Sequence, residues 1–131
     1  MLGRKNFTQE ELDAARSAVG AQLAAYRTLG APADDVEVTH FNAMALALDR
    51  RFVHRLRGVT GKDGTPLNEL ELIADSLMNN DGVLQGNTVV TYDAARSVTG
   101  LKIGDPVRLT AGDFERLATG VLDELTAKYL G

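Results

Sequence analysis

Hydrophobic residues recur at helical spacing in four stretches of the chain. The first stretch opens with the segment FTQEEL at residues 7–12, in which Thr8 caps a helix and Glu11 returns the hydrogen bond three residues later. Gly30 and Pro32 are typical of the end of a helix. We therefore predict a first helix from Thr8 to just before Gly30. Its apolar positions are Leu12, Ala15, Val19, Leu23 and Tyr26.

The second predicted helix runs from about Thr39 to Arg57, after a polar connector at residues 31–38. Two further apolar residues, Leu46 and Val53, lie seven apart and well off its main stripe. We expect such a helix either to contact other elements on two sides or to lend its second stripe to a partner chain. The main stripe consists of Phe41, Met44, Ala45, Leu48, Phe52 and Leu56.

The third and fourth helices have clear start signals. Thr65 is a cap with Pro66 at the first helical position, and Gly82 is the left-handed terminator after the segment NNDG. Thr110 and Asp113 repeat the reciprocal cap at the start of the last helix. The predicted apolar faces are Leu67, Leu70, Ile73, Ala74, Leu77 and Met78 in the third helix, and Phe114, Leu117, Ala118, Val121, Leu122 and Leu125 in the fourth.

Between these two helices the pattern changes to extended structure. Residues 88–92 (TVVTY) and 106–109 (PVRL) predict two short strands that pair. The link at residues 93–100 fits either a loop or one helical turn capped by Asp93. The fold class we predict is mainly α, with about four helices in one compact domain over residues 1–131 and a small two-stranded β element before the last helix.

The amino-acid composition indicates the kind of core and excludes several kinds of site. Hydrophobic residues make up 44% of the 131 residues but aromatic residues only 5%, so we expect an aliphatic core. The chain has no cysteine, which excludes disulfides, thiolate nucleophiles and cysteine zinc sites and fits a reducing compartment. No apolar stretch approaches the length that spans a membrane. We expect a cytoplasmic protein that has no contact with membranes.

The clearest candidate for chemistry is the segment LDRRFVHRLRG at residues 48–58. Arg50, His54 and Arg57 recur at i, i+4 and i+7, so all three can face one anion, and Lys62 follows in a glycine-rich loop. Together they predict a site for phosphate, a carboxylate or a nucleotide. The structural alternative is that cations near a helix C-terminus simply complement its macrodipole. Nucleic-acid binding is not expected, because the chain has a formal net charge of -4.

The sequence indicates no catalytic residue, cofactor or metal site. Its two histidines, His40 and His54, would lie about 21 Å apart on one helix, so one metal ion cannot bind both. No serine lies in a nucleophile-elbow motif. The leading hypothesis is a non-enzymatic helical interaction protein that forms a homodimer through Leu46 and Val53 or through the small residues of the first helix. The alternative is a small-anion or nucleotide-binding protein that uses Arg50, His54, Arg57 and Lys62.

Overall fold

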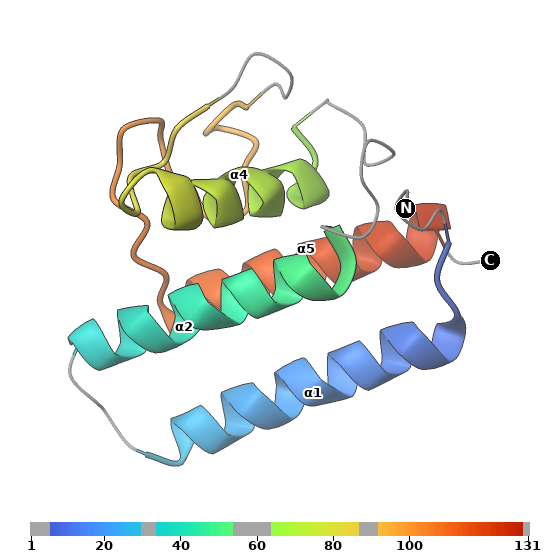
Figure 1. Cartoon of the computed structure of the whole chain (residues 1–131). Coiled ribbons are helices and arrows are strands. Elements are labelled where there is room, and N and C mark those ends of the chain that lie inside the picture. The colour runs from blue at the N-terminus through green and yellow to red at the C-terminus, as the bar shows by residue number, and fades with distance from the viewer. Residues whose placement is uncertain (1–5, 30–33, 54–63, 87–91, 130–131) are drawn as a thin grey trace.

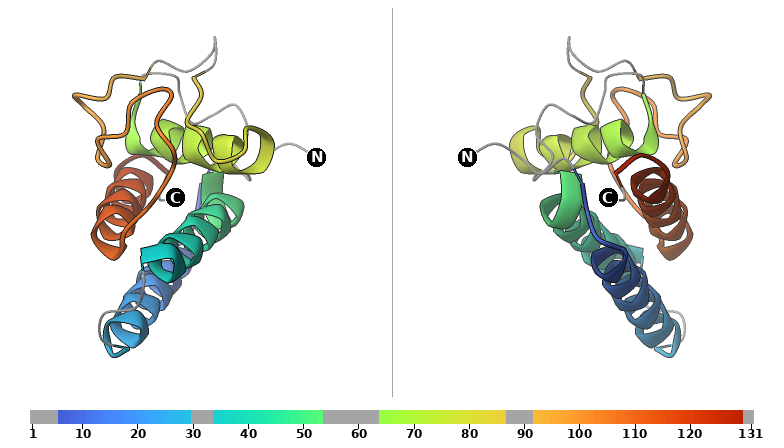
Figure 2. Two further views of the ribbon diagram at one scale, coloured as in Figure 1. Left: turned by 90° about the vertical axis from the view of Figure 1, so that its left-hand side faces the viewer. Right: turned by 90° about the vertical axis from the view of Figure 1, so that its right-hand side faces the viewer.

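Four α-helices account for most of the chain in the computed structural model, which describes residues 6–29, 34–53, 64–86 and 92–129. They are α1 (Gln9–Arg27), α2 (Asp34–Leu48), α4 (Pro66–Asn79) and α5 (Ala111–Tyr129), and a π-helical turn, η1 (Asp49–Val53), continues α2. In Figure 2, α5 lies on one side, α1 and α2 lie together on the other, and α4 crosses above them. The predicted mainly helical class is confirmed.

α1 begins where the sequence predicts. The Thr8 hydroxyl oxygen accepts a hydrogen bond from the Glu11 N–H at 3.1 Å, and the Glu11 carboxylate accepts one from the Thr8 N–H at 3.2 Å. This reciprocal pair satisfies two backbone donors that have no partner within the helix. Just before it, the Phe7 N–H donates to the Tyr129 carbonyl at 2.7 Å. The start of α1 is thereby tied to the end of α5.

α5 packs against α1, α2 and α4. Its start carries the predicted cap, because the Asp113 N–H donates to the Thr110 hydroxyl and the Thr110 N–H donates to the Asp113 carboxylate, both at 3.1 Å. Every position of its predicted stripe is buried: Phe114, Leu117, Ala118, Val121, Leu122 and Leu125. These side chains join the buried residues of the other helices in one hydrophobic cluster.

α2 starts earlier than predicted, at Asp34 instead of Thr39. The prediction treated residues 31–38 as a connector because they are polar. Acidic residues at positions 34, 35 and 37 instead suit a first helical turn, where they interact favourably with the partial positive charge of the helix N-terminus. The predicted core stripe is buried at Phe41, Met44, Ala45, Leu48 and Phe52, while Leu56 lies outside the described residues.

α4 has the predicted start, but its cap comes from another helix. Thr65 occupies the cap position before Pro66, yet its side chain makes no capping hydrogen bond. The Leu67 N–H instead donates to the buried carboxylate of Glu124 on α5 at 3.0 Å, and Lys128 pairs with the other oxygen of that carboxylate at 2.8 Å. A buried carboxylate on α5 therefore fixes the N-terminus of α4.

The buried face of α4 is wider than the predicted apolar face and is rotated around the helix axis relative to it. Met78, predicted on the apolar face, is 69% exposed, whereas Leu72, absent from the prediction, is buried. Loop segments lie along α4 on the side away from α5 in Figure 1, and two of them bond to it: the Val98 N–H donates to Glu69 at 2.9 Å and the Gln85 N–H donates to Ser76 at 3.0 Å. The helix ends as expected, with Asp81 and Gly82 in the left-handed region at φ 54° and 75°.

The predicted β element is not present in the described part of the chain. Residues 87–91, most of one predicted strand, lie outside it, and residues 106–109 form no strand. An isolated antiparallel bridge joins Val83 to Pro106. Further along the segment, the Asn42 side chain acts as the partner of the backbone: it donates to the Val107 carbonyl at 2.8 Å and accepts from the Leu109 N–H at 3.2 Å. A side chain of α2 thus takes hydrogen bonds that a neighbouring strand would make.

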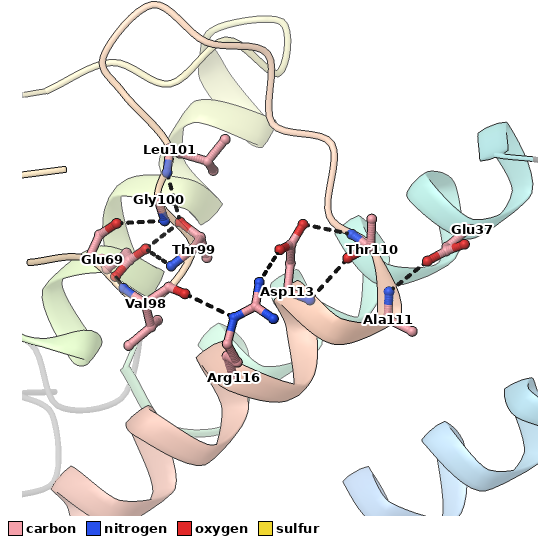
Figure 3. Close-up of polar contacts among 11 residues, drawn as sticks. Glu37, Glu69, Val98, Thr99, Gly100, Leu101, Thr110, Ala111, Asp113 and Arg116 are labelled. Carbon is pink, nitrogen blue, oxygen red and sulfur yellow. Dashed lines mark hydrogen bonds and ion pairs between the residues drawn. The ribbon is translucent and has the colours of Figure 1, made fainter. Parts of the chain in front are cut away.

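Residues 93–100 form a turn held by a buried carboxylate. The Asp93 side chain accepts from the Ala95 N–H at 3.0 Å, so the predicted cap is present on a turn without a full helix. Beyond it, the Glu69 carboxylate of α4 accepts from the N–H groups of Val98 and Thr99 at 2.9 and 3.1 Å (Figure 3). Glu69 is only 2% exposed, so these bonds also satisfy a charge that burial would otherwise penalise.

We expect Glu124→Ala to lower the free energy of unfolding by about 1–3 kcal/mol, because the Leu67 N–H at the start of α4 would lose its partner in a buried position. The neighbouring Asp123 is the matched control. Its side chain is 65% exposed and pairs with Arg16, so Asp123→Ala should cost less than about 1 kcal/mol. Urea unfolding of both variants measures the difference. Equal losses would show that the Glu124 contact does not anchor α4.

Candidate functional site

The structure describes only one of the four residues predicted to bind an anion. Arg50 lies on η1 with its side chain exposed. His54, Arg57 and Lys62 lie outside the described residues, so the anion site stays a prediction. Of the predicted interface pair, Leu46 is half-buried on α2, and the backbone of Val53 belongs to η1 while its side chain lies outside what the structure describes.

Beside Arg50, a half-buried aspartate faces two acidic residues of α4. Burial, together with the negative charges of Glu71 and Asp75, raises the pKa of Asp49 from 3.8 to about 6, against the opposing positive charge of Arg50. Burial also raises the pKa of Glu71 above its usual value of 4.5. Glu71 and Asp75 lie four residues apart on α4, but sequence reasoning missed the cluster because only the packing of two helices brings Asp49 to them.

α1 and α2 form an antiparallel hairpin whose two ends are closed by aromatic contacts. At one end the rings of Phe7 and Phe52 meet edge to face with centroids 5.1 Å apart. At the other end the ring of Tyr26 stacks on His40 at 5.6 Å and meets Phe41 edge to face at 4.7 Å. These large side chains hold the two helices together at both ends of the pair.

Between the aromatic contacts, smaller side chains leave a shallow groove. Its volume of about 60 Å³ is far below the roughly 300–1,000 Å³ of a typical small-molecule pocket, so it does not fit a nucleotide or a cofactor. The groove is lined by Ala18, Val19 and Gln22 of α1, by Met44, Ala47, Leu48 and Arg51 of α2 and η1, and by Phe114 of α5.

The outward sides of the two helices meet along this groove, because both Ala18 and Ala47 line it. Arg51 of η1 lines the groove, but neither helix carries Asp, Glu, Lys or Arg from Ser17 to Tyr26 in α1 or from Val38 to Leu48 in α2. On the outward side of these helices, alanines are the most frequent residues, and most of them are exposed. We call this surface the hairpin face; it consists of Ala14, Ala18, Ala21, Gln22, Ala25, Val36, Ala43, Leu46 and Ala47.

The outward side of α5 shows that this lack of charge is not a general property of the molecule. Its exposed positions include Glu115, Arg116, Asp123 and Lys128. The two arginines of α1, by contrast, reach toward α5: Arg16 pairs with Asp123 and Arg27 pairs with Glu115, both at 3.0 Å. The uncharged part of α1 is visible in the sequence, but only the structure shows that it adjoins the uncharged part of α2.

The described residues hold neither a metal-binding cluster nor a membrane-spanning helix. No group of three or more acidic or histidine side chains is placed to hold a metal ion. None of the helices there is long and apolar enough to cross a membrane.

Comparison of the chain with protein-family models, with curated proteins and with solved structures found no match. A proposal for function therefore depends on the surface of the molecule itself.

Asp49→Asn should stabilise the protein at pH 7.5 by roughly 1–3 kcal/mol, because a carboxylate whose folded-state pKa is raised destabilises the folded protein once it ionises. In the folded protein Asp49 binds its proton more tightly than in the unfolded chain. The wild type therefore loses stability as the pH rises from about 4 to about 6, and the variant lacks this loss.

Urea unfolding of both proteins at pH 4 and pH 7.5 measures this effect. The gain from Asp49→Asn should be large at pH 7.5 and small at pH 4. A gain that is the same at both pH values would contradict the assigned environment of Asp49.

Proposed function

We propose that the protein is a non-enzymatic interaction module that forms a homodimer through the hairpin face. The observation that supports this most directly is the absence of charged residues over adjoining exposed parts of α1 and α2. The buried centres of protein interfaces are depleted in charged residues, because a charge that loses water without gaining a partner costs free energy.

The sizes of the side chains favour a helical partner. Ala14, Ala18, Ala21 and Ala25 recur at i, i+4, i+7 and i+11, so they form one narrow stripe along α1. Interaxial distances between packed helices depend on the side chains at the contact, and alanine allows the closest approach after glycine. A flat face of short side chains beside a shallow groove suits the ridges of another helix pair.

Apolar side chains on α2 add to this surface. Val36 is 54% exposed, and Leu46 is half-buried. Both lie on the side of α2 that carries Ala43, away from the buried stripe of the helix. Covering them would remove apolar area from water at about 25 cal/mol per Å².

Alanine also favours helices in isolation, so an alanine-rich surface has a second explanation that needs no partner. A charge introduced on the hairpin face distinguishes a dimer interface from a surface whose alanines only favour helix formation. Ala21→Glu and Ala47→Glu should each weaken the dimer at least about tenfold in Kd, because an interface would bury the new carboxylate without a partner. Ala127→Glu, at an exposed alanine of α5, is the matched control and should leave the Kd unchanged.

Sedimentation equilibrium at several protein concentrations measures the Kd, and circular dichroism checks that each variant retains its helices. A wild-type protein that stays monomeric at the highest concentration would refute the proposal. An equal effect of all three substitutions would also refute it.

A further inference from the structure

α2 carries opposite charges at the two ends of its outward side. Asp35 lies in its first turn, with a side chain that is 92% exposed and one ion pair to Arg108 at 3.3 Å. Arg50 lies at the other end, on η1, and is also exposed. No Asp, Glu, Lys or Arg lies between Val38 and Leu48. The outward side of α2 is therefore negative at its start, uncharged in its middle and positive at its end.

Ala43 lies near the midpoint of these two charges. Asp35 precedes it by two turns of helix, and Arg50 follows it by about two turns, so the charges are roughly 22 Å apart along the axis. An antiparallel copy of α2 centred on the same alanine would place each negative end against a positive end. A parallel copy would place like charges together, which is unfavourable.

We propose that the second copy packs antiparallel across α2, with Ala43 beside the two-fold axis and Arg50 paired with Asp35 of the partner subunit. This inference rests on the proposed self-association and adds its orientation and contacts. A two-fold interface repeats each contact, so it contains two such ion pairs. The packing also covers both copies of Val36 and Leu46, which flank Ala43 on the two sides.

The short side chain of Ala43 suits a position on the axis. Packed helices lie 8–10 Å apart, and Cα atoms lie about 2.3 Å from each helix axis, so the Cα atoms of residues that face each other across a two-fold axis come within roughly 3.5–5.5 Å. The upper part of this range overlaps the Cα separation of a disulfide, about 4.4–6.8 Å. The natural chain has no cysteine, so a single introduced cysteine has only its symmetric copy as a partner.

Ala43→Cys should therefore form an intermolecular disulfide readily under mild oxidation, whereas the control Ala127→Cys on α5 should remain largely monomeric on a non-reducing gel at the same concentration. Cross-linking of the two variants at the same rate would reflect random collision and would overturn the proposed position of the axis.

Charge reversal tests the ion pairs independently. Asp35→Arg and Arg50→Asp should each weaken the dimer by about fivefold or more in Kd, because each places like charges opposite one another, and the double variant should recover most of the lost affinity. Arg108→Ala, which removes the existing partner of Asp35 within the same chain, should not weaken the dimer. Failure of the double variant to recover affinity would overturn the pairing.

The outcomes separate this inference from the proposed function. Dimers that dissociate with Ala21→Glu and Ala47→Glu, but neither cross-link through Ala43→Cys nor respond to charge reversal, would refute the antiparallel arrangement and leave the hairpin face as the interface. A wild-type monomer at all concentrations would refute both.

Discussion

The arrangement of the molecule depends on the packing of α1, α2 and α4 around α5. Leu117, Val121 and Leu125 on α5 have no exposed surface, so this helix has little freedom to move without opening the core. Hydrogen bonds near both ends of α5 also fix its position relative to α2 and α4. Near its start, the Ala111 N–H donates to the Glu37 carboxylate of α2 at 2.8 Å (Figure 3), and near its end Glu124 holds the first turn of α4.

The exposed surface follows from the same packing. Because α1 and α2 both lie against α5, they meet each other mainly through aromatic side chains at the two ends of the pair, and a groove remains between them. The ion pairs of Arg16 and Arg27 both reach α5, which puts these charges on the flank of α1. The middle of the outward side, from Ser17 to Tyr26 in α1 and from Val38 to Leu48 in α2, is left without Asp, Glu, Lys or Arg, although nothing in the core requires it to be so.

Local signals in the sequence predicted the helices well. The caps at Thr8 and Thr110 depend on residues three positions apart, and the left-handed turn at Gly82 depends on glycine itself, so each can be recognised without the rest of the fold. The segment at 106–109 was wrong as a strand because its backbone pairing is limited to the bridge at Pro106, and the Val107 carbonyl and Leu109 N–H bond to the Asn42 side chain, more than sixty residues away in the sequence. β-branched residues indicate an extended backbone but do not identify its partner.

The surface was predicted only in part. Leu46 was correctly singled out as lying off the core stripe, and the small residues of α1 were named as a possible contact, but the junction of the two helices could not be read from either sequence segment alone. The buried carboxylates Glu69 and Glu124 were not foreseen, since their backbone partners lie 29 and 57 residues away. Such contacts depend on tertiary packing, which has no local pattern.

We propose that the hairpin face of this helical scaffold contacts a second copy of the chain. An isotope-filtered NOE spectrum of a mixed sample, in which half of the molecules are labelled with ¹³C and half are unlabelled, reports contacts between copies directly. The account predicts intermolecular NOEs from the methyl groups of Ala43, Ala47 and Leu46. A spectrum at high protein concentration with no intermolecular NOEs, or with NOEs only from α5 or α4, would contradict it.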